Sequence, residues 1–106
     1  MVIQRCYIAG RMTGMPEFNR PAFNAAAAQL RTLGYHVENP AEIPPIPGDP
    51  WAAYMRLALT MMLKCDVVVL LPGWEGSKGA TIEQRLAVDL GIPVITFPDF
   101  LNGTHA

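Results

Sequence analysis

Charged residues are scarce in this chain, at 16% of 106 residues, and the net charge at pH 7 is −1. The 8 lysines and arginines are scattered, so no basic patch indicates binding to a nucleic acid polymer. Long apolar runs are also missing, since none reaches the roughly 18 residues that a membrane span requires. The N-terminus lacks the pattern of a signal peptide. We therefore expect a soluble, cytoplasmic protein whose partner is a small molecule rather than a nucleic acid or a membrane.

Metal-ligand spacing is absent as well. The two cysteines, Cys6 and Cys65, form no CxxC pair, while His36 is isolated and His105 lies next to the C-terminus. This pattern predicts no metal site and indicates no cofactor. Buried free thiols in a reducing compartment are the default for such cysteines, and a single disulfide is the alternative.

Strand and helix signals alternate along a chain whose length fits one domain. Apolar, β-rich runs predict strands over residues 2–9, 35–38, 66–71 and 92–97. Helices are expected from an Asn19 cap to Gly34, over 51–64 and over 79–90, while residues 39–50 with their five prolines form an extended loop. This alternation predicts a three-layer, flavodoxin- or Rossmann-like α/β fold. Its four-stranded parallel sheet has the order 2-1-3-4, with helices on both faces.

The helix over residues 51–64 is apolar around most of its circumference. Such a helix is either deeply buried or packed on another subunit. In a domain of this size we favour a subunit interface, and hence a homodimer or higher homo-oligomer. Trp51, at the start of this helix, is expected to pack in the core or in that interface.

The most informative segment runs from the third strand through a loop of Gly, Ser and Pro into the third helix. Ligands of open α/β sheets bind where strand ends meet helix N-termini, because free backbone N–H groups point there. Ser77 and Gly79 lie where a phosphate or a sugar hydroxyl could bind. At about 100° per residue, Gly79, Glu83, Leu86 and Leu90 fall within one arc of roughly 60°.

Glu83 is thus expected on the face of the helix that packs on the sheet. A buried carboxylate costs several kcal/mol unless it is paired, so we favour a functional role. The alternative is a glutamate that only interacts with the helix dipole. The strand order also brings the loop after the first strand to this segment. Tyr7 would then lie close to Glu83 and could tune its pKa, or it could be an ordinary strand aromatic.

Further candidates lie in the two loops. Gly10 and Arg11 follow the first strand, and a guanidinium suits phosphate oxygens, although Arg11 could equally be a solvated loop cation. Trp74 could stack on a base or close over the strand end as part of the wall. Asn39-Pro40 is expected to end the second strand with a turn.

Together these motifs resemble a family of small phage and bacterial proteins of uncharacterised function. That family is grouped with the nucleoside 2-deoxyribosyltransferases and the deoxynucleoside 5′-monophosphate N-glycosidases. The motifs that carry the resemblance are Tyr7-Ile8-Ala9-Gly10, Met12-Thr13-Gly14, Asn39-Pro40, Leu71-Pro72-Gly73-Trp74 and Ser77-x-Gly79-Ala80-x-x-Glu83.

The resemblance implies a nucleoside or nucleotide substrate and a role for each matching residue. Glu83 would attack the anomeric carbon, Tyr7 would hold that glutamate, and Ser77 and Gly79 would contact a 5′-phosphate. One departure matters, because the enzymes carry an aspartate on the preceding helix that assists the leaving base, and Ala58 stands at that position. Asp49 or Glu75 could substitute from loops.

Two classes of function follow from these expectations. The first is a nucleoside or nucleotide N-glycosidase or 2-deoxyribosyltransferase, and the second is a nucleotide-binding module of the same fold without turnover. A weaker option is a phosphoribohydrolase that releases cytokinin-type bases, whose Pro-Gly-Gly-x-Gly-Thr-x-x-Glu motif is similar to the segment from Pro72 to Glu83. Trp74 replaces the second glycine of that motif.

Overall fold

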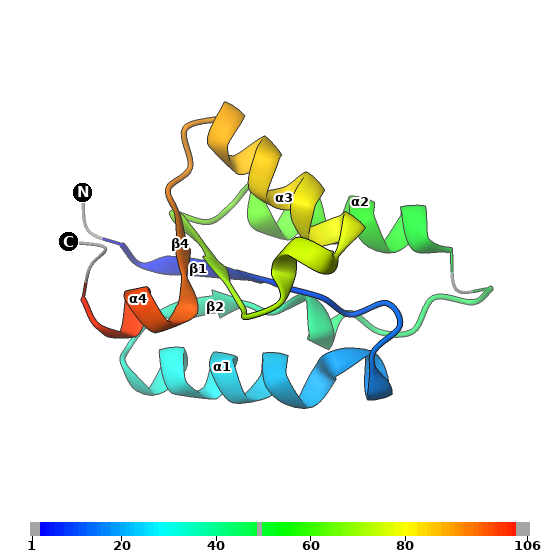
Figure 1. The fold of residues 1–106 in the computed structure, drawn as a ribbon, viewed down its shortest axis with the longest axis horizontal. Helices are drawn as coiled ribbons and strands as arrows, with labels where there is room; N and C mark the ends of the chain where they lie inside the picture. Colours follow the sequence, from blue (N-terminus) through cyan, green and yellow to red (C-terminus); the bar gives the residue numbers. More distant parts are fainter. Residues whose placement is uncertain (1–2, 49, 104–106) are drawn as a thin grey trace.

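The four strands form one parallel sheet in the order β2-β1-β3-β4, as the sequence predicts. We describe the protein from a computed structural model that places residues 3–48 and 50–103. The strands are β1 (Arg5–Ala9), β2 (His36–Glu38), β3 (Val67–Leu70) and β4 (Val94–Thr96), and the α-helices are α1 (Arg20–Thr32), α2 (Trp51–Met62), α3 (Lys78–Asp89) and α4 (Phe97–Leu101). In Figure 1, α1 and α4 lie on one side of the sheet, and α2 and α3 lie on the other. The α/β fold therefore has the three layers that the sequence predicts.

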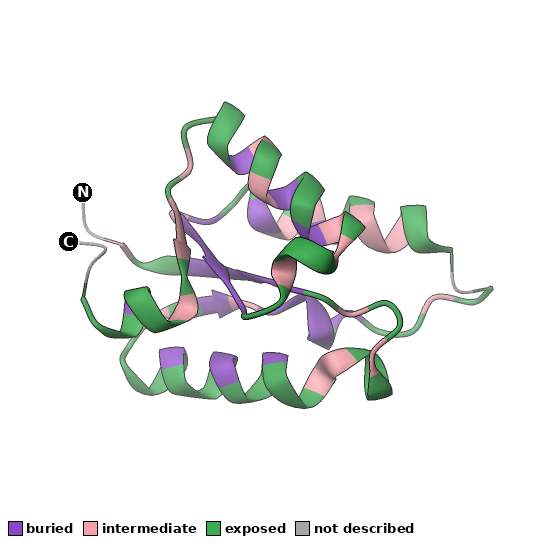
Figure 2. Cartoon of the chain, viewed as in Figure 1, coloured by how far each residue is buried: buried purple, intermediate pink, exposed green. Residues whose placement is uncertain are grey.

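The central strands β1 and β3 separate two apolar cores, because successive side chains of a strand point to opposite faces. Cys6 and Ile8 belong to the core under α1 and α4, whereas Tyr7 belongs to the core under α2 and α3. Both strands are buried along most of their length in Figure 2. Tyr7 is fully buried at 0% exposure, so its phenol must find a hydrogen-bond partner inside the α2–α3 layer.

The strands are shorter than expected, and near two of their ends a side chain accepts backbone N–H groups. The Asp66 carboxylate accepts the backbone N–H groups of Gln4 and Arg5, both at 2.9 Å, where β1 enters the sheet. The fourth strand was expected to reach Phe97, and this is wrong. Thr96 Oγ1 accepts the N–H of Asp99 at 3.4 Å and begins helix α4 in a segment that was expected to carry little signal.

The start of α1 also differs from expectation. Asn19 occupies the N-cap position, but it makes no side-chain cap. Its amide instead donates to the backbone oxygen of Arg11 at 2.9 Å and ties the β1–α1 loop to the helix. Asn39 behaves as expected, because its Oδ1 accepts the Ala41 N–H at 3.0 Å and begins a 3-10 helix, η2 (Pro40–Glu42). Residues 39–50 are therefore not loop throughout.

Helix α2 is less buried than its apolar sequence indicates. Only Ala58 and Met62 are buried, while Leu57 and Leu63 are exposed by 46% and 52%. These exposed leucines are compatible with a subunit interface through α2, which stays a prediction. Within the part of the chain that the structure describes, no helix is long and apolar enough to cross a membrane.

Candidate functional site

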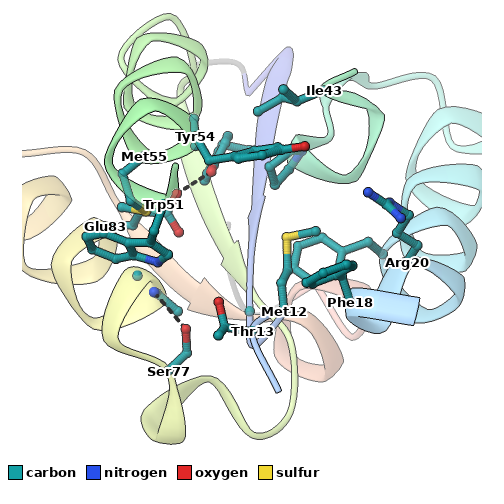
Figure 3. Close-up of a pocket in the computed structure, with 17 residues that line it drawn as sticks. Met12, Thr13, Phe18, Arg20, Ile43, Trp51, Tyr54, Met55, Ser77 and Glu83 are labelled. Atoms are coloured by element: carbon teal, nitrogen blue, oxygen red, sulfur yellow. Dashed lines mark hydrogen bonds between the residues drawn. The ribbon is translucent and has the colours of Figure 1, made fainter. Parts of the chain in front are cut away.

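A pocket of about 200 Å³ opens at the carboxyl end of β1, between α2, α3 and the residues that precede α1 (Figure 3). Its walls are mostly apolar and aromatic, with a few polar groups. The residues that line it are Tyr7, Gly10, Met12, Thr13, Phe18, Arg20, Phe23, Pro40, Ile43, Trp51, Tyr54, Met55, Ala58, Ser77, Gly79, Ala80 and Glu83. An apolar cleft with a few converging polar groups is the usual form of a small-molecule site.

Tyr7 and Glu83 meet at the floor of this pocket. The Tyr7 hydroxyl donates a hydrogen bond to Glu83 Oε2, between residues 76 apart in the sequence. Glu83 is only 4% exposed. In the described ranges no cation pairs with it, and the ion pair found there joins Arg31 to Glu42. Glu83 is therefore a buried carboxylate that faces a cavity and has a phenol as its partner.

Burial and the phenol act on Glu83 in opposite directions. Removal from water penalises the charged form and raises the pKa of Glu83 from 4.5 to about 7, while the hydrogen bond from Tyr7 lowers it. Burial also raises the pKa of Tyr7 well above its usual value, and the Glu83 charge adds to that effect. The phenol therefore stays protonated as the donor, and the carboxylate titrates close to neutral pH.

Helix α3 places Glu83 by packing small residues on the sheet. Its buried positions are Ala80, Glu83 and Ala87. Leu90 was expected on the same packed face, but it is 55% exposed and follows the last helical residue, Asp89. That part of the predicted arc is wrong. The alanines let α3 approach β1 closely enough for the glutamate to reach the Tyr7 hydroxyl.

The N-terminus of α3 forms another part of the wall, as the sequence predicts. Ser77 is the N-cap, and its Oγ accepts the Ala80 N–H at 3.1 Å. Gly79 lies one turn before Glu83, where a Cβ would come within 3.0 Å of Met55 Sδ. A side chain at position 79 would therefore fill the space between α3 and α2.

Phe18 and Arg20 form the wall on the α1 side, which the sequence analysis missed. A short 3-10 helix, η1 (Pro16–Asn19), precedes α1, and Glu17, Phe18 and Asn19 in it have positive φ angles of 52°, 53° and 60°. Such left-handed backbone costs on the order of 1–3 kcal/mol per non-glycine residue. The Arg20 guanidinium lies 5.3 Å from the Phe18 ring centroid. No sequence pattern signals this turn, since none of its residues is a glycine.

Helix α2 supplies the wall opposite α1, through Trp51, Tyr54, Met55 and Ala58 (Figure 3). Trp51 was expected in the core or in a subunit interface; the structure excludes the core, and the interface stays a prediction. Its side chain is 37% exposed, and the Lys78 ammonium lies 4.5 Å from its ring centroid. Ala58 stands at the position where the resemblance implies an acid, and its side chain lines the pocket.

Not every predicted site residue reaches the pocket. Tyr7, Gly10, Ser77, Gly79 and Glu83 line it. Arg11 and Trp74 do not. The Arg11 guanidinium lies outside, beside Gly14 and Gly76, and Trp74 packs partly buried against the core under α2 and α3. Glu75 is exposed and away from the pocket lining, and Asp49 lies outside the described residues.

Over residues 3–48 and 50–103, no three His, Cys, Asp or Glu side chains cluster in a way that could hold a metal ion. Cys6 and Cys65 are both buried free thiols, and burial raises the pKa of each to about 12. Among the described residues that line the pocket, the ionisable groups are the Glu83 carboxylate, the Tyr7 and Tyr54 phenols and the Arg20 guanidinium.

The fold and the pocket define a class: a small, doubly wound α/β domain with a pocket at the carboxyl end of its parallel strands, where such sheets bind ligands. The chain belongs to the family described as Domain of unknown function (DUF4406), which matches residues 4–96. No curated protein matches it in sequence. The family match covers all four strands and all the residues that line the pocket.

Proposed function

We propose that this domain breaks the N-glycosidic bond of a nucleoside or nucleotide, as a 2-deoxyribosyltransferase or a deoxynucleoside 5′-monophosphate N-hydrolase does. The observation that carries the proposal is the buried Glu83 carboxylate, which faces a small-molecule pocket and has the Tyr7 hydroxyl as its hydrogen-bond partner. A carboxylate is seldom buried without a cation unless it is used. The resemblance of the chain's motifs to those enzymes points to the same residue.

Glu83 acts as the nucleophile in this proposal. Its carboxylate attacks the anomeric carbon and forms a covalent glycosyl-enzyme, which water or a second base then resolves. The Tyr7 hydroxyl fixes one carboxylate oxygen and leaves the other for attack. Because the pKa of Glu83 is about 7, a large fraction of the enzyme carries the ionised nucleophile at neutral pH.

The start of α3 would hold the sugar or its 5′-phosphate. Backbone N–H groups are free at a helix N-terminus, and the helix dipole favours an anion there. The Ser77 hydroxyl accepts from Ala80, so its own proton is available to donate to a phosphate oxygen. Gly79 leaves the space that the ligand needs, and Gly10 also lines the pocket.

A second candidate is a nucleotide-binding module of the same fold without turnover. The observation that favours it is Ala58, which lines the pocket at the position where the related enzymes carry an acid for the leaving base. Loss of a general acid costs roughly 10²–10⁴ in rate. The protein could therefore keep affinity for a nucleotide and lose most of the reaction.

Release of free base from ribo- and deoxyribonucleosides and their 5′-monophosphates separates the two candidates. We expect release by the wild type and its loss in Glu83→Gln, which keeps the size of the side chain and an acceptor for Tyr7. Glu75→Gln is the matched control, because Glu75 is an exposed glutamate outside the pocket. Binding without release by the folded wild type would establish the second candidate.

The setting of this activity follows the sequence. We place the domain in the cytoplasm, and we propose that it assembles as a homodimer or higher homo-oligomer through α2, where Leu57 and the C-cap residue Leu63 are exposed. The ligand is a small molecule, and neither a nucleic acid polymer nor a cofactor enters the proposal.

A further inference from the structure

Among the described residues, the pocket offers the proposed nucleophile Glu83 but no acid for the leaving group. Among residues 3–48 and 50–103, Glu83 is the only carboxylate that lines it. The Tyr7 proton is already donated to Glu83. On the α2 side the wall consists of apolar and aromatic side chains, with Ala58 buried among them. A base that must be protonated in order to leave finds no acid there.

This lack matters only for certain substrates. When a Glu83 oxygen bonds to the anomeric carbon, the bond from that carbon to the base nitrogen breaks and its electron pair moves to the nitrogen. A neutral base then departs as an anion unless an acid protonates it. A base with a positive charge on its ring uses the same electron pair to neutralise that charge, and it leaves as a neutral molecule. Water then attacks the anomeric carbon, frees the carboxylate and passes a proton to the solvent.

The walls of the pocket also suit a positive ring. Trp51, Tyr54 and Phe18 line it, and an aromatic face attracts a cation within about 6 Å of its centroid. The Trp51 ring already holds one cation, since Lys78 Nζ lies 4.5 Å from its centroid. Glu83 adds a negative charge with no cation of its own in the described structure. A positively charged ring next to Glu83 would supply the missing cationic partner.

Arg20 limits where the positive ring can lie. Its guanidinium lines the pocket on the α1 side, whereas Glu83 comes from α3 (Figure 3). A cationic base is repelled from Arg20 and attracted to Glu83, so the two charges orient the ligand. A phosphate on the same ligand, bound at the start of α3, would also be attracted to Arg20, which lines the same pocket.

We propose that the substrate is a nucleoside or nucleotide whose base carries a positive charge, such as a pyridinium or an N-alkylated purinium. This inference rests on the proposed function, because it takes Glu83 as the nucleophile. It adds that the enzyme selects substrates by the charge of the leaving base and needs no general acid.

The test compares cationic and neutral bases in matched pairs. Nicotinamide riboside and its 5′-monophosphate are set against uridine and UMP, and 7-methylguanosine and its 5′-monophosphate against guanosine and GMP. Spontaneous release in buffer is subtracted, and Glu83→Gln serves as the inactive control. We expect Glu83-dependent release from the cationic member of each pair to exceed that from its neutral partner by at least about 10²-fold, the lower limit of a general-acid contribution.

An added acid supplies a second measurement. Ala58→Asp should speed release from the neutral nucleosides by at least tenfold more than it changes release from the cationic ones, with Ala58→Asn as the control for size. Asp49, which lies outside the described residues, is changed to Asn in parallel, and release should not change. If either variant fails to fold, the comparison of cationic and neutral bases with the wild type still tests the inference.

The outcomes separate the inference from the proposed function. Glu83-dependent release from neutral bases at rates within tenfold of their cationic partners would overturn the inference and keep the glycosidase. Loss of release from neutral bases in Asp49→Asn would do the same, because it would identify a general acid. No release from any substrate would overturn both.

Discussion

The Tyr7 hydroxyl, on the central strand, donates to Oε2 of Glu83 on α3, and this bond opposes the effect of burial on the carboxylate. Burial alone would hold Glu83 in its neutral form near pH 7. A nucleophile needs the ionised form. The phenol therefore sets the pH range in which the proposed reaction can run.

Tyr7→Phe removes that donor and leaves the ring in place. Hydrogen bonds to charged groups contribute about 1.5–3 kcal/mol, so the pKa of Glu83 should rise by on the order of one unit above its value of about 7. We expect the acid limb of the pH–rate profile to move up accordingly, with a loss of about tenfold at pH 6 and little loss at pH 9. Tyr54→Phe is the control, because its hydroxyl bonds to Pro44 and not to Glu83. Equal losses at both pH values would contradict this role of Tyr7.

Glu83→Gln should make the protein more stable at alkaline pH. The folded state raises the pKa of Glu83 from 4.5 to about 7, so its contribution to stability is fully present below pH 4.5 and is lost as the pH rises through 7. Glutamine does not ionise, so the variant avoids this loss of unfolding free energy. The loss amounts to about 3 kcal/mol, at 1.36 kcal/mol per pKa unit. Urea unfolding of both proteins at pH 4.5 and pH 9 measures it.

Glu42→Gln is the comparison variant, because its effect on stability should have the opposite sign to that of Glu83→Gln. The hydrogen bond from Arg31 lowers the pKa of Glu42, so that pair stabilises the protein above pH 4.5 and the benefit is lost as the pH falls through the lowered pKa. Glu42→Gln should therefore be destabilised at neutral pH, although only slightly because the pair is about half exposed. A Glu83→Gln variant that is destabilised at pH 9 would refute a buried, unpaired carboxylate at this site.

Gly79→Ala should weaken ligand binding without weakening the fold. The added Cβ would lie 3.0 Å from Met55 Sδ, so the methionine must move and the pocket narrows. Alanine is favoured over glycine in a helix by about 1 kcal/mol, so thermal stability should hold or rise. We expect KM or Kd to rise about tenfold and the double variant with Met55→Ala to recover most of it. A double variant that stays as weak as Gly79→Ala would show that steric overlap with Met55 is not the cause.

Arg20 and Arg11 form a matched pair of exposed or partly exposed cations that flank the same loop. Only Arg20 lines the pocket. Arg20→Gln should weaken binding of 5′-monophosphates relative to nucleosides by about tenfold, a loss that corresponds to about 1.4 kcal/mol. Arg11→Gln should change neither. Isothermal titration of both ligand types on the Glu83→Gln background measures this, and the reverse pattern would restore Arg11 as the anion-binding residue that the sequence suggests.

The proposed interface through α2 can be tested by charge. Leu57→Glu together with Leu63→Glu places carboxylates at the exposed leucine of α2 and at the exposed leucine that caps it. We expect size-exclusion chromatography with light scattering to show an oligomer for the wild type and a monomer for this variant. Val88→Glu, at a position of α3 that is 56% exposed, is the control and should leave the oligomer intact. A monomeric wild type would refute the interface.

The sequence predicts the fold well, because its strongest signals are periodic. The continuous β-branched run of Val67, Val68 and Val69 indicates a strand covered on both faces, and the alternation of elements favours a parallel sheet of the observed order. Element ends are less well predicted. At Thr96 one side-chain hydrogen bond converts the expected end of a strand into the start of a helix.

The candidate site is predicted only where it coincides with a strand end or a helix start. Tyr7, Ser77 and Glu83 are placed by backbone geometry that the sequence signals directly. The positions of Phe18 and Arg20 depend on a left-handed turn that the residue types in this segment do not predict. Trp51 and Tyr54 depend on how far α2 stands from the sheet, and that distance follows from the packing of the whole domain.

The separation of Tyr7 from Glu83 has a practical consequence. Residues 44–48, between the two halves of the chain, are exposed apart from the half-buried Ile46, and they lie in neither a helix nor a strand. A cut in this loop would put the phenol on one fragment and the carboxylate on the other. Neither fragment alone would then contain both Glu83 and the Tyr7 hydroxyl that favours its ionised form. Any activity would therefore show that the two fragments had reassembled. The same pair would give the domain a built-in complementation assay.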